Sequence, residues 1–475
     1  MNKFVKVVSL LMALIMCLGM IACSNGAAPA SETKNEAAPA AETKDDSKKE
    51  GSGTGRDVGL AQPEAAKDLD GTFEVGVVCA LSSTHAATNG WLMASLEATQ
   101  AYVNGNGGID GKKLIYTLYD PESDASTLKQ RLTDIKNSGA VLAIAGVNDA
   151  LAPAAAQWAS ENEYPVFLTS NTSTEITLGN YSDYAFSMGK NAWGFGKILA
   201  LHCVGKEGKK NFCFVGTDGA ATIDAENFLL YEGKKIDPNF EMLGSFRINF
   251  NDTEFSNIIA AATALNPEMV LQQGGGPNFV SFCQQASLFG LFDFCDVYND
   301  LVTDASTNQP LIEGDEFPYG KTHGITTLPF WDIKNMDEDL QYYYDLWSKT
   351  EIATTNGYLV SEHALNYYNI MKCMLLAVDD CVKNGKDYND PKVLTEAISN
   401  VKWSDYNGNH YFRTGIDNQF VSNLYYGTSA YSDEYPGVAI CGPDWETYSG
   451  EEFLPSAEEM KAWAADHNWD TTRFN

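Results

Sequence analysis

The chain of 475 residues is short of positive charge. It holds 32 Lys and Arg residues against 63 Asp and Glu residues, which gives a formal net charge of −31. Such a surface repels phosphate backbones and offers no basic stripe, so we expect no nucleic-acid partner. Anionic membrane surfaces are disfavoured for the same reason. The acidity is most simply that of a well-solvated surface.

Histidine is also scarce, and the motifs of catalysis and metal binding are missing. The six histidines stand neither at metal-ligand spacings nor beside a Gly-x-Ser-x-Gly nucleophile turn. The glycines at 274–276 lack the following Lys and Ser or Thr that a phosphate-binding loop requires. We therefore predict that the protein is not an enzyme and that it holds no metal and no cofactor.

The apolar run near the N-terminus is too short to span a bilayer comfortably. It extends from Val7 to Met20, follows a basic start and precedes Ala22 and Cys23, which is typical of an export signal. Cys23 directly after Ala22 resembles the bacterial lipobox, in which the cysteine is acylated and becomes the mature N-terminus. This predicts a signal peptide at residues 1–22 and an extracytoplasmic protein held at the cell membrane by fatty chains such as palmitate on Cys23.

Large apolar residues are almost absent from the next segment. Residues 24–70 consist mainly of Ala, Pro, Ser, Thr, Gly, Lys and Glu, which cannot bury enough surface to offset chain entropy. We therefore predict a disordered tether over residues 23–71. About 400 residues remain, enough for two globular domains with sizeable cores.

The cysteines bear on whether the chain contains disulfides. Of ten cysteines, Cys17 would leave with the signal peptide and Cys23 would carry the lipid. Cys79 and Cys213 lie inside apolar, strand-like runs, where a free buried thiol is a common small apolar group. Export permits disulfides. Pairings such as Cys373 with Cys381, or Cys283 with Cys295, stay open from the sequence.

Apolar periodicity alternates between strand-like and helix-like segments along the chain, which indicates an α/β fold with parallel sheets. The expected strands are 73–81, 113–119, 140–145, 165–169, 211–216, 269–273 and 294–298. The clearest helical patterns are 90–104, 128–136, 192–204, 252–265 and 358–383.

Several segments of the first half together resemble a known family. They are Phe73-Glu74-Val75-Gly76-Val77-Val78, Gly107-Gly108-Ile109-Asp110-Gly111, Tyr119-Asp120-Pro121, Val141-Leu142-Ala143-Ile144-Ala145-Gly146 and Tyr164-Pro165-Val166-Phe167-Leu168-Thr169-Ser170. Their order and spacing resemble the leucine/isoleucine/valine-binding receptors of ABC importers, a family of type I periplasmic binding proteins. The resemblance is strong from about residue 72 to 190 and weak in the last 75 residues.

The resemblance implies a particular domain organisation. It implies two Rossmann-like α/β lobes with parallel sheets, joined by a hinge of three crossovers, which close on a solute between them. The expected N-terminal lobe comprises residues 72–188 plus 329–400. The expected C-terminal lobe comprises residues 189–328 plus 401–475. The aromatic-rich last segment is expected mainly to pack over the second lobe.

In open α/β sheets, ligands bind outside the carboxyl ends of the strands, so the loops after strands are the candidate site. The first such loop contributes Ser83, His85 and Asn89, which offer polar groups at the start of a helix that favours a ligand carboxylate. A capping role is an equally good interpretation of a single Ser or Thr there. Asn148 follows another expected strand, while Asp149 beside it fits a capping role better.

The resemblance implies further ligand-binding residues. Ser173 and Thr174 align with the segment that holds an α-amino-acid head group in the family. Asp300 stands where the family presents a carboxylate to the ligand ammonium, although a surface-turn role is an equal alternative. Thr222 replaces an aromatic residue of the second lobe, which predicts a solute bulkier than, or different from, a branched-chain amino acid.

The sequence thus predicts a solute-binding lipoprotein of an ABC importer. Its partners would be a small, amino-acid-like polar solute, a permease with its ATPase, and the membrane through the lipid. The alternative is a ligand-sensing receptor subunit that signals through a membrane partner. Both interpretations need a solute that favours a closed state of two lobes.

Overall fold

The computed structural model describes residues 69–82, 90–169, 173–250, 252–356 and 362–474. Residues 52–475 form one compact unit and residues 1–51 form another, so every described residue belongs to the larger unit. The predicted signal peptide, Cys23 and nearly all of the predicted tether lie outside the described residues. Within those residues, no helix combines the length and apolar character needed to cross a membrane.

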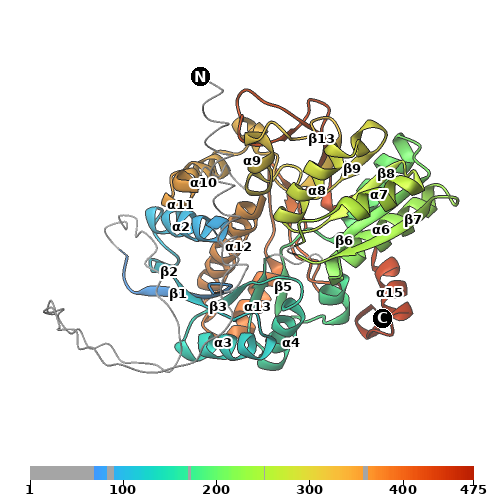
Figure 1. Ribbon diagram of the computed structural model, residues 1–475. Helices are drawn as coiled ribbons and strands as arrows, with labels where there is room; N and C mark the ends of the chain where they lie inside the picture. Colours follow the sequence, from blue (N-terminus) through green and yellow to red (C-terminus); the bar gives the residue numbers. More distant parts are fainter. Residues whose placement is uncertain (1–68, 83–89, 170–172, 251, 357–361, 475) are drawn as a thin grey trace, which may run out of the picture. The chain divides into compact units, whose positions relative to one another are not determined.

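The first sheet is parallel and has the strand order β2-β1-β3-β4-β5 (Figure 1). Its strands are β1 (Thr72–Cys79), β2 (Lys113–Tyr119), β3 (Leu142–Gly146), β4 (Val166–Leu168) and β5 (Ala185–Ser187). The helices on one face are α2 (Gly90–Gly105), α10 (Glu338–Ser348), α11 (Glu351–Asn356) and α12 (Glu362–Lys383), while α3 (Ala125–Ser138) and α4 (Ala152–Asn162) cover the other. α13 (Pro391–Asn400) packs on α12. We call this sheet with its helices the first lobe.

The second sheet has the order β14-β13-β10-β9-β8-β6-β7, with β15 paired to β13. Its strands are β6 (Asn211–Thr217), β7 (Glu241–Ile248), β8 (Met269–Gln273), β9 (Asp296–Tyr298), β10 (Thr322–Thr326), β13 (Leu424–Ala430), β14 (Ile440–Cys441) and β15 (Glu446–Tyr448). β6 to β10 are parallel, and β13 joins β10 antiparallel. The helices are α5 (Ala192–Ala200), α6 (Ala220–Ile236), α7 (Ser256–Leu265), α8 (Gly276–Leu288) and α9 (Ala305–Glu313). We call this sheet with its helices the second lobe.

Short elements complete the described chain. They are the π-helical turns η2 (Glu175–Gly179) and η3 (Leu201–Lys206), the 3-10 turns η4 (Leu291–Asp293), η5 (Phe330–Asn335) and η6 (Thr472–Phe474), the hairpin β11 (Trp403–Asp405) and β12 (Gly408–His410), and the helices α14 (Gly450–Phe453) and α15 (Ala457–Asp466).

The chain passes between the two sheets three times. It leaves the first sheet after β5 and enters the second lobe through α5, returns after β10 to build α10 to α13, and crosses again before β13. This arrangement confirms the predicted α/β fold of two lobes with parallel sheets. The residue boundaries proposed for the lobes stay a prediction.

Local sequence explains how individual elements begin and end, as α3 shows. Asp124 precedes the helix, and its side chain accepts a hydrogen bond of 2.8 Å from the Thr127 N–H, which satisfies a donor that the helix leaves free. The helix ends at Gly139, whose φ of 89° suits glycine far better than other residues. The intervening apolar positions Leu128, Leu132 and Ile135 recur on one face and are buried against the first sheet.

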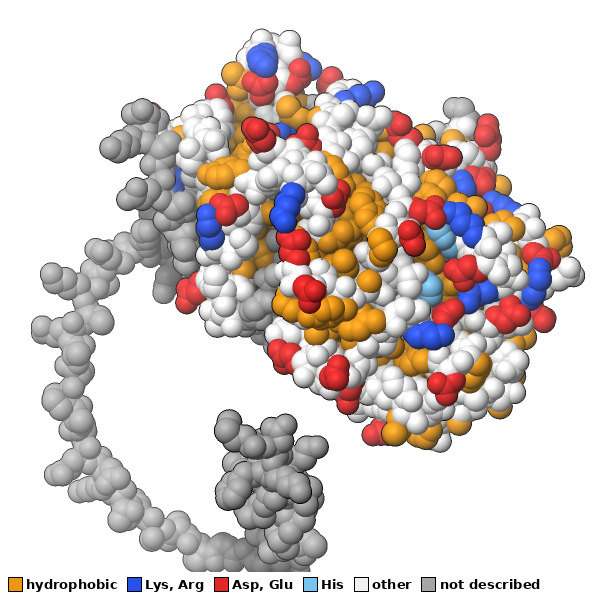
Figure 2. All heavy atoms as spheres, turned by 90° about the horizontal axis from the view of Figure 1, so that it is seen from above, with side chains coloured by type: hydrophobic (Ala, Val, Ile, Leu, Met, Phe, Trp, Pro, Cys, Tyr) orange, Lys and Arg blue, Asp and Glu red, His pale blue; other side chains and the backbone are white. Residues whose placement is uncertain are grey.

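Most charged side chains lie on the surface of this fold, although a few, such as Glu226, Glu232 and Asp417, are buried. Figure 2 shows acidic side chains spread over one face of the molecule, with Lys and Arg side chains between them. Among the described residues, the largest fully buried side chains are aromatic, including Trp347, Tyr343, Tyr344, Tyr367 and Tyr368 of the first lobe. The large excess of acidic residues in the sequence is therefore compatible with sizeable apolar and aromatic cores.

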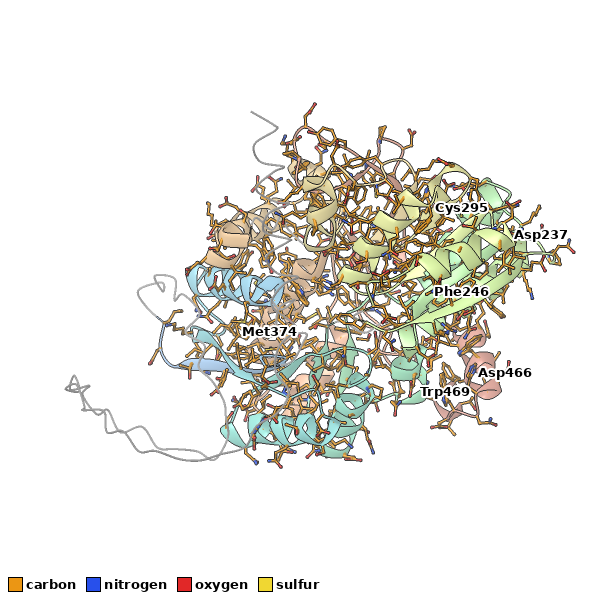
Figure 3. All side chains as sticks on the ribbon, viewed as in Figure 1. Asp237, Phe246, Cys295, Met374, Asp466 and Trp469 are labelled. Atoms are coloured by element: carbon orange, nitrogen blue, oxygen red, sulfur yellow. The ribbon has the colours of Figure 1, made fainter. Side chains whose placement is uncertain are left out.

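The eight cysteines within the described residues are all free and buried. They include Cys373, Cys381, Cys283 and Cys295, the candidates for disulfides, which the structure leaves unpaired. Figure 3 labels Cys295 beside the second sheet. Burial raises the pKa of the Cys295 thiol to about 12, so the reactive thiolate is disfavoured.

We expect these thiols to be unreactive in the native protein. Ellman's reagent should titrate close to none of them before unfolding and all eight after unfolding in urea without reductant, because each is buried and free. A lower number in urea would show that the cell envelope has oxidised a pair, and early reaction of several thiols in buffer would contradict the burial.

Two buried histidines alternate with tyrosines in a stack of rings on the second sheet. His202 stacks on Tyr426 with ring centroids 3.5 Å apart, and His323 stacks on Tyr298 at 4.6 Å. The Tyr426 and His323 rings, 6.3 Å apart and tilted by 17°, connect the two pairs. Burial, with a contribution from the nearby Lys206, lowers the pKa of His202 to about 4.

This shift predicts acid sensitivity. A histidine whose pKa falls from 6.5 to about 4 on folding binds its proton more tightly in the unfolded chain. The free energy of unfolding should therefore fall as the pH drops from 6.5 towards 4, by on the order of 3 kcal/mol from this residue alone. His202→Phe should remove that component, so the stability difference between wild type and variant should shrink towards pH 4 in urea titrations. A pH-independent difference would contradict the prediction.

Candidate functional site

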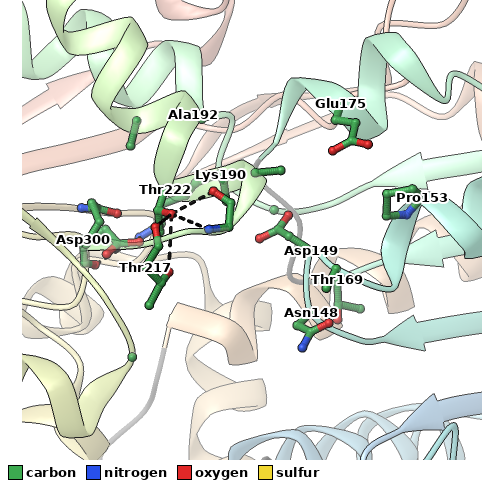
Figure 4. A pocket seen from close by; sticks show the side chains of 18 of the residues that line it. Asn148, Asp149, Pro153, Thr169, Glu175, Lys190, Ala192, Thr217, Thr222 and Asp300 are labelled. Atoms are coloured by element: carbon green, nitrogen blue, oxygen red, sulfur yellow. Dashed lines mark hydrogen bonds and ion pairs between the residues drawn. The ribbon is translucent and has the colours of Figure 1, made fainter. Parts of the chain in front are cut away.

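A cavity of about 970 Å³ lies where carboxyl ends of strands from both sheets meet (Figure 4). The first lobe contributes the ends of β3 and β4 and residues of α3, α4, η2 and α12, while the second contributes the ends of β6, β8, β9 and β10. The volume is at the upper end of the range of ~300–1,000 Å³ typical of small-molecule sites. The cavity therefore stands at the place where open α/β sheets bind ligands.

The floor of the cavity carries a cluster of three charged side chains, two of which are largely buried. Lys190 follows β5 in the first connection between the sheets, Glu362 begins α12, and Asp300 follows β9. The Lys190 Nζ lies 2.7 Å from Glu362 Oε1 and 4.0 Å from Asp300 Oδ2. Side-chain exposure is 8% for Lys190 and 10% for Glu362 but 28% for Asp300. Asp300 is thus the member of the cluster that is open to the cavity.

The pKa values of the cluster are shifted in different directions. Burial raises the pKa of Asp300, although the Lys190 ammonium opposes this. Burial also acts to raise the pKa of Glu362, but Lys190 outweighs it and the net pKa is lowered. Burial acts to lower the pKa of Lys190, but Glu362 and Asp300 outweigh it and the net pKa is raised. Lys190 and Glu362 therefore form the ionised pair, and Asp300 carries the least compensated charge.

Acidic groups outnumber basic groups around the cavity as a whole. The described lining residues include five carboxylates, Asp149, Glu175, Asp218, Asp300 and Glu362, against two lysines, Lys129 and Lys190. In a partly desolvated cleft, this excess attracts a positively charged group more than it attracts an anion.

Apolar surface forms other parts of the wall. Phe195 and Phe250 line the cavity together with several alanines. Gly275 follows β8, and a Cβ at this position would overlap the Phe250 ring, so glycine allows the ring to lie against the backbone. The Trp91 ring stacks on His363 of the wall at 4.2 Å, and Asn366 donates a hydrogen bond of 2.9 Å to the Thr169 carbonyl. These contacts position the start of α12, and with it Glu362.

The structure brings three of the predicted ligand-binding residues to the cavity wall, namely Asn148, Thr222 and Asp300. The Thr222 hydroxyl is used locally in the first turn of α6, where it donates to the backbone carbonyl of the N-cap residue Gly219 at 2.9 Å. Asp149 also lines the cavity, and the N-cap of α4 is Leu151 rather than Asp149. Ser83, His85 and Asn89 lie outside the described residues.

Ser173 and Thr174 stand beside the cavity but bond to a carboxylate of the other lobe. Asp224 Oδ2, on α6, accepts hydrogen bonds from the Thr174 N–H at 2.6 Å, the Thr174 hydroxyl at 2.8 Å and the Ser173 hydroxyl at 3.2 Å. Burial raises the pKa of Asp224, although these three bonds favour its ionised form. The two residues proposed to hold an amino-acid head group therefore tie the lobes together in this structure.

Sequence reasoning missed Lys190, Glu362 and Asp224. Lys190 follows β5, a strand of three residues that the periodicity did not reveal. Glu362 lies near the start of an expected helix, where an acidic residue is common and carries no signal of its own. Asp224 lies in the second turn of α6 and looks like a solvated helix residue in the sequence.

The sequence matches the family model described as periplasmic binding protein over residues 72–432. This is more than half of the chain, and the chain belongs to the periplasmic binding protein family. None of the curated proteins compared matches the chain.

Solved structures of solute-binding proteins share the fold. A periplasmic binding protein from Burkholderia mallei has a TM-score of 0.67 and 17% identity, covering 82% of this chain and 97% of that chain. A solute binding protein of an ABC transporter from Rhodopseudomonas palustris BisB5, in complex with 3,4-dihydroxybenzoic acid, has a TM-score of 0.65 and 16% identity, covering 80% and 98%. The leucine-, isoleucine-, valine-, threonine- and alanine-binding protein from Brucella ovis, in a closed conformation, has a TM-score of 0.66 and 16% identity, covering 82% and 98%. Identities this low show the common fold alone.

We expect Asp224 to contribute to stability through its contacts with the first lobe. Asp224→Ala leaves the Thr174 N–H and two hydroxyls without their acceptor and should lower the free energy of unfolding by about 2 kcal/mol. Asp218→Ala, two residues before α6 at a side chain that is 77% exposed, should change it by less than about 0.5 kcal/mol. Urea titration of both variants checks this, and equal effects would contradict a role for the contact.

Proposed function

We propose that this protein is the extracytoplasmic solute-binding component of an ABC importer and that its solute carries a positively charged amine. The observation that carries the proposal is Asp300, a partly exposed carboxylate at the cavity floor whose neighbours Lys190 and Glu362 already neutralise each other. A charge-assisted hydrogen bond from a ligand ammonium would compensate that remaining charge. The family and the position of the cavity support solute binding as the activity.

The charge of the wall helps to choose between the kinds of ligand bound by similar structures. The Rhodopseudomonas palustris protein holds an aromatic acid, whereas the Brucella ovis protein is named for amino acids. Five carboxylates against two lysines favour a solute with an ammonium group over a simple aromatic acid. The large volume and the Phe250 ring support a solute bulkier than a branched-chain amino acid, so we propose an amino-acid-like solute with a sizeable apolar part.

Delivery of the solute to the importer would require the N-terminal lipid anchor and tether that the sequence predicts. We propose that Cys23 carries the lipid and that residues 23–71 form the tether that keeps the receptor near its permease and ATPase. Solute binding would favour a closed state of the two lobes, provided that the solute binds the closed state more tightly than the open one. No catalytic step belongs to this proposal.

Thermal-shift screening of the purified protein tests the proposal. Amino acids, amino-acid amides and amines should raise the melting temperature, because a ligand that binds only the folded state stabilises it. Benzoate and hydroxybenzoates should raise it less. Asp300→Asn should weaken binding of the best amine about tenfold or more, because it removes the charged acceptor.

Asp296→Asn is the matched control. Asp296 begins the same strand β9, its side chain is 25% exposed, and it pairs with Lys209 at 2.9 Å on a part of the lobe that does not line the cavity. This variant should keep the solute affinity. If the wild-type protein and Asp300→Asn both bind aromatic acids more tightly than amines, the proposed solute class is wrong. If no solute raises the melting temperature, the proposal of solute binding itself is wrong.

A further inference from the structure

Lys190 uses all of its hydrogen-bonding capacity within the protein. Its ammonium donates to Glu362 Oε1 at 2.7 Å and to the backbone carbonyls of Asp300 and Ile325, both at 3.2 Å. An ammonium has three N–H donors, and the structure provides an acceptor for each. Lys190 therefore has no donor left for a solute, although it lines the cavity.

Glu362 is satisfied in the same way. Its Oε1 faces Lys190, and its Oε2 accepts a hydrogen bond of 3.0 Å from the Thr326 hydroxyl and one of 3.2 Å from the Thr327 N–H. A carboxylate with these partners and 10% exposure offers little to a solute. The Lys190 ammonium thus cancels the charge of Glu362 and occupies the place beside it that a solute cation would otherwise take.

The carboxylates around this pair differ in how much of each side chain is exposed to a solute. Asp300 lies 4.0 Å from the Lys190 ammonium and keeps 28% of its side chain exposed. Asp304, on the same loop, is buried and accepts a hydrogen bond from the Thr307 N–H at 3.0 Å as the N-cap of α9. Asp300 is therefore the acidic member of the floor that remains for a solute.

We infer that Lys190 is a specificity-determining residue, which selects solutes with one positive charge at the cavity floor over solutes with two. This inference rests on the proposed function, since it concerns the charge of the amine end of the solute. Removal of the Lys190 charge would leave Asp300 and Glu362 both uncompensated. Two carboxylates would then favour a solute that brings two ammonium groups.

Two simple amines serve as probes, n-butylamine with one ammonium and 1,4-diaminobutane with two. Their dissociation constants are measured by thermal shift and calorimetry on the wild-type protein and on Lys190→Met, which keeps the side-chain length. Wild type should bind n-butylamine at least as tightly as the diamine. Lys190→Met should shift the ratio of the two dissociation constants about tenfold or more towards the diamine.

Two further variants separate charge from structure. Lys190→Met combined with Glu362→Gln removes one charge of each sign, so the ratio should return to the wild-type value although Lys190 is still absent. Lys209→Met is the matched control, because Lys209 is another lysine of low exposure, 13%, held between two carboxylates, at 3.3 Å from Glu207 and 2.9 Å from Asp296, away from the cavity lining. It should leave the ratio unchanged.

The outcomes distinguish the inference from the proposed function. If neither amine stabilises the wild-type protein, the proposed amine recognition fails and the inference fails with it. If n-butylamine binds but the ratio is the same in wild type, Lys190→Met and the double variant, the inference alone is overturned. If Lys190→Met does not fold, Glu362→Gln replaces it: Lys190 is then free to pair with Asp300, and n-butylamine should bind about tenfold more weakly. Unchanged binding there would also overturn the inference.

Discussion

The buried ion pair between Lys190 and Glu362 is the interaction on which the arrangement of the cavity depends. A buried pair stabilises a fold only when further hydrogen bonds satisfy the remaining donors and acceptors. Here those bonds come from separate parts of the chain: Lys190 donates to the carbonyl of Ile325 in β10, and Glu362 accepts from Thr326 and Thr327. The pair therefore joins the first crossing of the chain, the end of β10 and the start of α12. The ion pair thus connects a helix of the first lobe to strands of the second lobe at a single position.

The same requirement is the reason for proposing Asp300 as the group that binds the solute. Desolvation disfavours a charged group unless a partner compensates it. Lys190 compensates Glu362 at 2.7 Å but reaches Asp300 only at 4.0 Å, and the raised pKa of Asp300 follows from this difference. A positively charged group delivered from the cavity removes the imbalance. The amine recognition that we propose would thus follow from how the protein distributes one lysine between two carboxylates.

The sequence predicted the fold class well because long, strongly periodic elements carry it. β1, β2, β6 and β8 are apolar runs, and α2 and α12 have buried faces that match the helical period. Several of the described strands lacked such a signal, and β5, β7 and β10 show why. β5 has three residues, β7 lies at the edge of its sheet with mostly exposed or half-buried residues, and β10 reads Thr-His-Gly-Ile-Thr although all five residues are buried. Hydrophobic periodicity cannot distinguish a buried strand with polar side chains from a loop.

The site was less predictable than the fold, for a physical reason. Asn148 and Asp300 follow strands, where the rule that ligands bind at the carboxyl ends of strands places them at the wall, and the family resemblance pointed to Asp300 and Thr222. Lys190 and Glu362 acquire their roles only through contact with each other, far apart in sequence. The net charge of a site depends on all the side chains that meet there, so no single sequence motif reveals it.

A second set of contacts between the lobes would constrain any movement of one lobe against the other. Leu178 of η2, Trp193 and Phe228 of the second lobe and Met460 of α15 share one buried apolar cluster. The segment that contains α15 and η6 lies beyond the family match, and Figure 3 labels its Trp469. Its Arg473 donates to the Leu178 carbonyl at 3.0 Å.

Separation of the lobes at this seam would expose side chains whose burial contributes about 1.5–3 kcal/mol each. It would also break the three hydrogen bonds to Asp224, which lies one helical turn before Phe228 on α6. A rotation about the seam leaves both sets of contacts in place. Because Glu175 and Asn180, at either end of η2, line the cavity, such a rotation would keep this part of the wall fixed while the remainder of the cavity could change width. The contacts of the C-terminal segment would thus favour a pivot beside the candidate site over a movement that pulls the lobes apart.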